Sequence, residues 1–350
     1  MTTSLPSEPF GALTDGRQAT LFTLENDRLR VRITDFGGRM VGIESPDRTG
    51  RRDHVLLGFG SVAAYADHGG SFGTLLGRYA NRIAGASFVL DGQTYGLSRN
   101  EGTATLHGGA IAFSKMIWTV VAAEAKPAPR LVLAHVSPDG DQGFPGEVTV
   151  RATYQLDADT LSLTFEASTS KPTVINLSAH PYFNLGGPNH GDVLGHEVTI
   201  RAGAYLPTDT AQIPTGEKRP VAGTPFDFRT PMRLGGRIRQ SDPQLFHGLG
   251  YDHCFVLDAA GSAPAVMVRD PVSGRVLEIH TDQPGLQVYT GNKLIGAFAG
   301  HGGVVYRQSD GLALEAQDFP DAPHHPDFPP TTLRPGETYR RFIRYRFTAA

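Results

Sequence analysis

The segment from Val174 to Leu185 contains residue types that can bind a polyhydroxylated ligand and move protons. Its polar positions alternate with apolar ones and are Asn176, Ser178, His180, Tyr182 and Asn184. Because strand side chains repeat with a period of two, these polar groups would share one face of an extended strand, and the apolar face would bury in a core. Pro181 cannot donate to a ladder, so we expect the strand to be interrupted, or to lie at an edge, near His180. Taken alone, the pattern is equally typical of a half-exposed strand with one chance histidine.

Two later segments divide their residues in the same way. Between residues 312 and 317, Glu315 and Gln317 lie opposite the leucines, and between 285 and 292, Gln287 and Tyr289 lie opposite apolar residues. Glu315 taken singly is typical of a solvated carboxylate. Three strands that each combine an apolar face with a carboxylate, amide, imidazole or phenol face predict a sheet whose concave side binds a sugar.

The elements that must position these residues are short strands. The chain of 350 residues contains 42 glycines and 25 prolines, and short alternating stretches lie between them. Residues 148–156 and 161–167 predict one hairpin, and residues 265–269 and 275–280 predict another. Stretches of helical period are missing, so we expect an all-β sandwich or barrel. No repeat or linker divides the chain, so residues 1–350 are expected to form a single domain, with residues 1–12 and 320–330 the least regular.

Composition excludes several classes of partner. The net charge of −3 gives no electrostatic reason to expect nucleic acid or an anionic membrane surface. No apolar run approaches the roughly 18 residues of a spanning helix. The first residues lack the basic start and apolar stretch of a secretory signal. A single cysteine, Cys254, excludes an internal disulfide, and a cytoplasmic location is expected.

Three further motifs offer binding groups. Asn81 and Arg82 lie among small residues, and a guanidinium is a planar fork of donors suited to adjacent ring hydroxyls or to a carboxylate. Because these two residues are consecutive, a bend or loop is needed for both to reach one site. His107 precedes two glycines, which allow close backbone approach, and Asp252 leads into an apolar strand. Each motif is equally typical of ordinary surface or loop residues.

Two patterns point to other chemistry. Gly69, Ser71 and Gly73 satisfy the G-x-S-x-G pattern of a hydrolase nucleophile elbow, which needs a strand before the serine and a helix after it. The surrounding sequence predicts no α/β alternation, so a serine hydrolase is disfavoured. Thirteen histidines also raise the question of a metal site. No His-Glu-x-x-His motif is present, and the pairs His324–His325 and His190–His196 lie in loop-like sequence, so no metal is expected.

Taken together, these segments resemble the aldose 1-epimerase (galactose mutarotase) family. The matching pieces run in family order across nearly the whole chain, so the resemblance is specific although each piece alone is weak. They are Phe10-Gly11 with Asp15-Gly16, and residues 77–84, 100–109, 139–146, 176–185, 251–253, 287–292, 314–317 and 333–339.

The resemblance implies a large antiparallel β-supersandwich with the sugar on its concave face. It implies an isomerase without a cofactor that interconverts the α and β anomers of free aldoses such as galactose and glucose. By motif match, Glu315 corresponds to the base that takes the O1 proton, and His180 to the acid that protonates the ring oxygen. This assignment requires Glu315 ionised and His180 protonated.

The resemblance also implies a set of sugar contacts. The family positions that touch the sugar are matched by Asn81, Arg82, His107, Asp252 and Gln287. His107 is also expected to help hold charge at the ring oxygen. Tyr182, on the polar face that carries His180, completes the predicted substrate-binding set.

Some positions depart from the family pattern. Ala179, the stretch 100–105 and the stretch 324–327 differ from many members, which leaves galactose, glucose, arabinose and xylose open as substrates. A catalytically silent sugar-binding or regulatory relative is the alternative function, and its mark would be loss of Glu315 or His180. The expected partner is a small aldose, and the oligomeric state, monomer or weak dimer, is left open.

Overall fold

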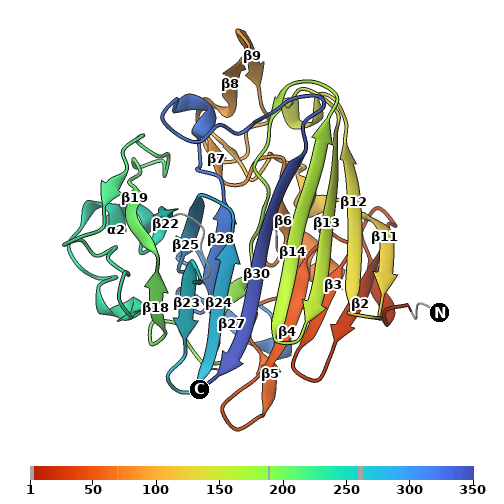
Figure 1. Ribbon diagram of the computed structural model, residues 1–350, viewed down its shortest axis with the longest axis vertical. Helices are drawn as coiled ribbons and strands as arrows, with labels where there is room; N and C mark the ends of the chain where they lie inside the picture. The colour runs from red at the N-terminus through yellow and green to blue at the C-terminus, as the bar shows by residue number, and fades with distance from the viewer. Residues whose placement is uncertain (1–3, 69, 188–189, 259–262) are drawn as a thin grey trace.

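The computed structural model describes residues 4–68, 70–187, 190–258 and 263–350 (Figure 1). Its largest element is a nine-stranded sheet whose neighbouring strands are all antiparallel. In order across the sheet, the strands are β11 (Thr119–Glu124), β12 (Arg130–Ser137), β13 (Val148–Asp157), β14 (Thr160–Thr169), β30 (Tyr339–Ala349), β24 (Arg275–Thr281), β23 (Val266–Arg269), β18 (Glu197–Ile200) and β21 (Met232–Arg233).

Two smaller antiparallel sheets pack against this one. The six-stranded sheet contains β17 (Tyr182–Phe183), β28 (Leu312–Gln317), β25 (Gly285–Tyr289), β22 (Asp252–Leu257), β19 (Ala202–Leu206) and β20 (Arg219–Pro220), in that order. The five-stranded sheet contains β1 (Ser7–Ala12), β2 (Gln18–Glu25), β3 (Arg30–Thr34), β4 (Met40–Pro46) and β5 (Arg52–His54). In Figure 1 the long strands β12, β13, β14 and β30 run side by side, with β2 to β4 behind them.

The remaining elements are short. Two-stranded ladders join β6 (Leu75–Leu76) to β16 (Ser178–Ala179), β7 (Arg82–Ile83) to β10 (Thr105–Leu106), β8 (Ser87–Leu90) to β9 (Gln93–Gly96), β15 (Thr173–Val174) to β29 (Thr332–Leu333), and β26 (Ile295–Ala299) to β27 (Val305–Arg307). The α-helices of the described residues are α1 (Val62–Asp67) and α2 (Pro243–Gly248), capped by Ser61 and Asp242. Single 3₁₀ turns cover 84–86, 113–115, 141–143, 234–236, 301–303 and 322–324. No helix in the described ranges is both long and apolar enough to cross a membrane.

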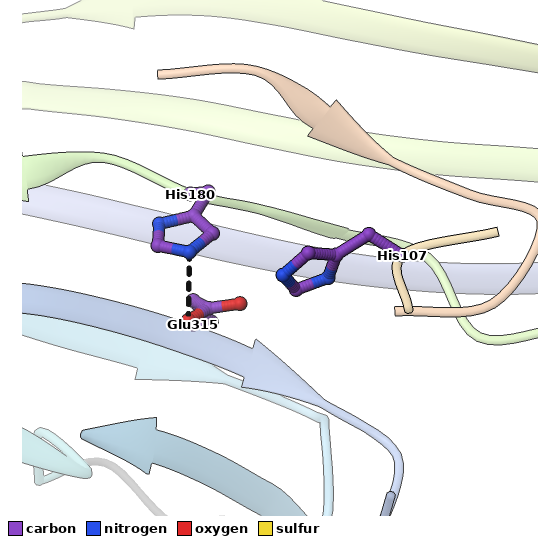
Figure 2. Close-up of side chains that lie close together, drawn as sticks. All are labelled: His107, His180 and Glu315. Carbon is purple, nitrogen blue, oxygen red and sulfur yellow. Dashed lines mark ion pairs between the residues drawn. The ribbon is translucent and has the colours of Figure 1, made fainter. Parts of the chain in front are cut away.

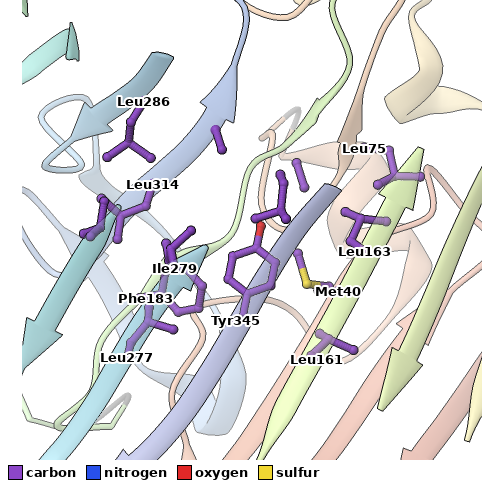
Figure 3. Packing of buried hydrophobic residues seen from close by; sticks show 14 of the residues in the cluster. Met40, Leu75, Leu161, Leu163, Phe183, Leu277, Ile279, Leu286, Leu314 and Tyr345 are labelled. Carbon is purple, nitrogen blue, oxygen red and sulfur yellow. The ribbon is translucent and has the colours of Figure 1, made fainter. Parts of the chain in front are cut away.

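One hydrophobic core joins the three sheets. Alternate residues of β13 and β14 are buried, as a half-buried strand requires. The main cluster includes Val31 of the five-stranded sheet, Leu163 and Ile279 of the nine-stranded sheet, and Leu286 and Leu314 of the six-stranded sheet. Figure 3 shows part of this packing around Tyr345. One face of β25 and β28 therefore packs in the core, and the side chains of the opposite face do not belong to this cluster.

The predicted hairpins are confirmed by β13–β14 and β23–β24. Two details differ from the sequence analysis. Part of the stretch expected to be irregular at the start of the chain is β1, which pairs with β2 along residues 7–12. Residues 174–185 are not one strand with a single break, because they contribute to β15, β16 and β17 in three different sheets.

Candidate active site

A cavity of about 320 Å³ lies over the six-stranded sheet, on the face opposite the core. Glu315 of β28, Tyr289 of β25 and Asp252 of β22 reach it from three adjacent strands. Loops and short strands complete its wall with Asn81, Arg82, Glu101, His107, His180, Tyr182 and Lys293, and the aromatic rings of His68, Phe72 and Phe298 also line it. A volume near the lower limit for ligand sites suits a small molecule.

Glu315 and His180 form a close pair of titratable groups in this cavity. The distance from His180 Nε2 to Glu315 Oε1 is 3.3 Å, and both side chains are almost fully buried (Figure 2). Alternation along β28 turns Leu314 and Ala316 into the core and Glu315 into the cavity. Glu315 Oε2 and His180 Nδ1 are buried and have no hydrogen-bond partner among the described residues. The pair therefore keeps bonding capacity that a ligand could use.

The backbone and a neighbouring ring hold His180 in place. Its backbone N–H donates to Thr74 O, and its carbonyl accepts from Gly73 N, so the residue is fixed although Pro181 ends the local ladder. The imidazole stacks on the Tyr182 ring, with centroids 4.7 Å apart and planes 10° apart. The expected interruption at Pro181 is confirmed, and it places His180 at a gap between β16 and β17 where its ring can turn into the cavity.

Burial moves the pKa values of this pair toward the neutral forms. Desolvation, with the nearby charge of Asp252, raises the pKa of Glu315 well above its ordinary value. Desolvation lowers the pKa of His180 to about 3. A neutral carboxylic acid beside a neutral imidazole carries the same single proton as a carboxylate beside an imidazolium. Without a ligand, burial therefore favours the neutral forms, whereas the prediction of an ionised Glu315 and a protonated His180 concerns the complex with the sugar.

His107 lies beside this pair as a neutral donor. It has a left-handed backbone, with φ of 52°, in the turn after β10. Its Nδ1 accepts a hydrogen bond of 3.0 Å from the backbone N–H of Asn81. Burial lowers the pKa of His107 well below its ordinary value, so the ring is neutral and its Nε2 carries the hydrogen. The ring packs edge-on against His180 at 5.4 Å, as Figure 2 shows.

Asn81 and Arg82 both reach the cavity because the backbone bends between them, as expected. Asn81 has a left-handed backbone with φ of 63°, and its side-chain oxygen accepts from the backbone N–H of Arg82. The guanidinium uses one edge of its fork on Glu101, with Nε–Oε2 at 2.6 Å and Nη2–Oε1 at 3.2 Å. Nη2 also donates to Gln212 Oε1 at 2.8 Å. Arg82 thus uses two guanidinium N–H groups, which we expected to bind sugar hydroxyls, to bind the carboxylate of Glu101.

Two glutamines hold Asp252 at its two oxygens. Gln287 Nε2 donates to Oδ1 and Gln212 Nε2 donates to Oδ2, both at 2.7 Å. Desolvation nevertheless raises the pKa of Asp252. Gln287 is not among the residues that line the cavity, whereas the other predicted site residues are. Gln287 lies opposite Glu315 in the ladder between β25 and β28, and its direct contact with a sugar stays a prediction.

The residues that support Arg82 were not predicted from the sequence. Glu101 follows Asn100 inside a matched motif, and Lys293 directly follows another, so inspection of motif borders could have found them. No sequence signal marks Gln212, which reaches the site from a loop with a left-handed φ of 60°. These residues come from loops far apart in the chain, and only the fold brings them together.

The structure also shows where the residues of a serine hydrolase motif and of a possible metal site lie. Ser71 lines the cavity, but helix α1 precedes it and strand β6 follows it, which is the reverse of a nucleophile elbow. Gly69 of that motif lies outside the described residues. The side chains of His107, His180 and Glu315 each offer a ligand atom, and these atoms lie within 4.8 Å of one another, so this trio could hold a metal ion. Sequence spacing could not show this trio, because its members are distant in the chain.

Comparison with known proteins gives the family. The aldose 1-epimerase family model matches residues 20–346. Galactose mutarotase from Sus scrofa is 42% identical, with 99% of each chain covered. Aldose 1-epimerase from Escherichia coli (strain K12) is 37% identical, with 96% of this chain and 97% of the relative covered. The crystal structure of galactose 1-epimerase from Lactobacillus acidophilus NCFM superimposes with a TM-score of 0.86 at 29% identity, with 99% of this chain and 100% of that chain covered. The fold is therefore the expected galactose mutarotase-like β-supersandwich, and the chain belongs to the aldose 1-epimerase family.

Proposed function

We propose that this protein is a mutarotase that interconverts the α and β anomers of free aldoses, with Glu315 and His180 as its acid–base pair. The observation that carries the proposal is the buried contact of 3.3 Å between these two side chains, at one end of a cavity of small-molecule size. Family membership supports the reaction type, and the geometry supports the residues.

The reaction needs one base and one acid. Glu315 takes the proton from the anomeric O1, the C1–O5 bond breaks as C1 becomes an aldehyde, and His180 gives its proton to O5. Rotation about the C1–C2 bond and reclosure with the roles reversed give the other anomer, so the pair holds one proton before and after. Each positioned proton-transfer group contributes roughly 10²–10⁴-fold.

Substrate binding places the proton where this sequence of steps needs it. Hydrogen bonds from sugar hydroxyls to the open Oε2 of Glu315 stabilise the carboxylate. The proton then resides on His180, which is the state that the assignment requires. The Nε2 hydrogen of His107 faces the same space and helps to hold the developing charge at O5.

The remaining predicted residues bind the other hydroxyls. Asn81, Arg82, Asp252 and Tyr182 line the cavity, and Gln287 and Gln212 keep the Asp252 carboxylate oriented. Arg82 contributes the part of its guanidinium that Glu101 and Gln212 leave available. No cofactor is needed for a reaction that transfers only protons within the sugar.

Residues 1–350 are proposed to work as a single domain, since one core cluster extends from Leu5 to Phe347. A cytoplasmic location and a monomer or weak dimer without nucleic-acid or membrane partners complete the proposal. The unpaired, buried Cys254 and the net charge of −3 support these points.

Polarimetry tests the function directly. Freshly dissolved α-D-glucose or α-D-galactose should approach its equilibrium rotation faster with the protein, and EDTA should make no difference. A catalytically silent sugar-binding relative would bind the sugar without acceleration. Activity that is lost to EDTA and restored by a divalent ion would replace the acid–base proposal by a metal at the trio of His107, His180 and Glu315.

A further inference from the structure

Arg39 is a buried cation that the catalytic mechanism does not use. It lies directly before β4, and 2% of its surface is exposed. No acidic group of the described residues forms an ion pair with it, and desolvation lowers its pKa to about 10, which leaves the guanidinium charged at neutral pH. Its Cζ lies 5.2 Å from the centre of the Phe36 ring and 5.1 Å from that of Tyr65. A buried charge is costly unless hydrogen bonds satisfy it, so the acceptors of Arg39 are informative about its role.

The guanidinium of Arg39 binds the backbone of a loop that lines the catalytic cavity. Nη1 donates to the carbonyl oxygens of Gly70 at 3.2 Å and of Phe72 at 3.1 Å, and Nη2 donates to Ser114 O at 2.8 Å. Gly70, Ser71 and Phe72 line the catalytic cavity, whereas Arg39 does not. Arg39 therefore holds this loop without touching the space that a ligand would occupy.

The same loop borders a second cavity. This cavity, of about 230 Å³, is lined in part by Arg39, Ser114, Gly70 and Ser71, and the last two residues line the catalytic cavity as well. At these two residues the loop is therefore a partition with open space on both sides, and side-chain packing alone does not fix it. Charge-assisted hydrogen bonds are stronger than neutral ones, so the bonds from Arg39 are a strong restraint on the loop.

The loop in turn holds His180 by its backbone and by its ring. Gly73 N donates to His180 O at 2.8 Å, and His180 N donates to Thr74 O at 2.9 Å. The Phe72 ring packs on Tyr182, with centroids 4.4 Å apart, and Tyr182 stacks on the imidazole of His180 at 4.7 Å. A displacement of the loop would therefore move both the backbone of His180 and the ring against which its imidazole lies.

We propose that Arg39 is a positioning residue for the acid–base pair, because it holds the loop of residues 70–74 in the place where that loop aligns His180 with Glu315. This role rests on the proposed function for the reaction and on the contacts of Arg39 and the loop for the geometry. Proton transfer needs its donor and acceptor within hydrogen-bond reach, so a displaced imidazole loses rate even when the sugar still binds.

The charge of Arg39 supplies a second property that can be measured. Burial lowers the pKa of His180, and the positive charge of Arg39 acts in the same direction because it opposes a second positive charge nearby. A substitution that removes this charge should therefore raise the pKa of His180. The other titratable groups around the imidazole are Glu315 of β28, Tyr182 of β17, Tyr289 of β25 and His107 in the turn after β10.

The test compares Arg39→Met, Arg39→Lys and the matched control Arg275→Met. Arg275 is equally buried and also donates to three backbone carbonyls, those of Ser45, Leu185 and Arg51, but it does not line the cavity. Methionine keeps a long, adaptable side chain between the rings and removes the charge and the donors. In polarimetry, Arg39→Met should lower kcat about tenfold or more and change KM less than about threefold, because a misplaced acid loses rate. Arg39→Lys, which keeps the charge without the fork, should lose less, and Arg275→Met should keep the kcat of wild type.

Nuclear magnetic resonance of the histidine rings gives a readout that needs no activity. The His180 signals, identified by their loss in His180→Gln, should shift in Arg39→Met and titrate at higher pH than in wild type, and they should stay unchanged in Arg275→Met. A wild type without mutarotase activity would contradict the proposed function, and this comparison would still test the positioning of His180.

Three results would overturn the positioning role of Arg39. They are a folded Arg39→Met variant with kcat within about twofold of wild type or with unchanged His180 signals, a rise in KM at unchanged kcat, and an equal loss of kcat in Arg275→Met. Circular dichroism verifies that each variant is folded. Should Arg39→Met fail to fold, Arg39→Lys is judged by the same limits on kcat and by the shift of the His180 signals.

Discussion

The two ends of the catalytic cavity differ in how far their polar groups are hydrogen-bonded to the protein. At one end, Glu315 and His180 each keep a buried atom with no hydrogen-bond partner in the described part of the chain. At the other end, both oxygens of Asp252 and one edge of Arg82 are bonded to protein groups. Groups that move protons need spare bonding capacity, whereas groups that orient a substrate work best when they are held still. In the proposed mechanism, this difference separates the residues that transfer protons from those that position the sugar within one small cavity.

The largest loss of activity is expected from substitutions at the end of the cavity that holds Glu315 and His180. His180→Ala and Glu315→Gln should each lower kcat by at least about 10²-fold, because each removes a proton-transfer group. Steady-state polarimetry measures this, and Ser71→Ala is the matched control because Ser71 lines the same cavity without a role in the mechanism. A His180→Ala variant with near-normal kcat and a raised KM would make His180 a binding residue.

A smaller loss of activity is expected at the other end of the cavity, where protein groups bond to Arg82 and Asp252. Arg82→Lys keeps the charge but cannot bond both Glu101 oxygens and Gln212, because an ammonium is a point donor. Charge-assisted bonds contribute about 1.5–3 kcal/mol, so kcat/KM should fall about tenfold or more. A fully active lysine variant would show that the fork geometry is not needed. In Glu101→Gln, which keeps the length but loses the charge, a smaller loss is expected.

A weaker change is expected at the support of Asp252. Gln287→Ala leaves Asp252 Oδ1 without its partner, so KM should rise about twofold to tenfold while kcat stays close to wild type, as for one neutral hydrogen bond. Gln283→Ala is the matched control, since Gln283 is equally buried but bonds to Leu177 and Tyr339 away from the cavity. A large loss of kcat in Gln287→Ala would mean that Gln287 contributes to the chemical step.

The smallest effect concerns pH. The pKa of Glu315 is raised, so its proton leaves only as pH rises through that raised value, and the pKa of His180 is lowered to about 3, so a second proton binds only near that pH. Between these limits the pair holds one proton, and kcat/KM should vary less than about twofold from roughly pH 5 up to the alkaline limb. Glu315→Gln should lose the alkaline limb from its residual activity. An acid limb near pH 6.5, the ordinary value for histidine, would contradict the lowered pKa of His180.

Alternation explains why the sheet could be predicted from the sequence. The strands that carry Glu315 and Tyr289 bury one face in the core, and this leaves a period of two in the sequence. The same rule was only partly right for residues 174–185, because both faces of that segment are buried. Asn176, Ser178 and Asn184 bond to backbone groups rather than to the cavity, so their polarity marks structural hydrogen bonds.

The site was predictable only where a residue type carries its own chemistry. His180, Glu315, His107 and Asp252 were found because acids, bases and family motifs identify them. The network of Arg82, Glu101 and Gln212 depends on which loops the fold brings together above the sheet. Such contacts between loops leave no periodic signal in the sequence. The burial that shifts the pKa values of Glu315 and His180 was also out of reach, since it depends on the fold rather than on residue type.

The residues that line the cavity are distributed widely along the sequence, and this distribution has a consequence for unfolding. Its residues lie between positions 68 and 315 and are contributed by four adjacent strands of one sheet, by short two-stranded ladders and by loops from distant parts of the sequence. An ensemble that loses β22 or β28 loses the site together with part of the core, so a sugar binds only the complete fold. By mass action, a sugar at 100 times its Kd should stabilise the native state by about 2.7 kcal/mol and raise the melting temperature as a whole. Thermal denaturation would then report sugar affinity without any turnover of the sugar.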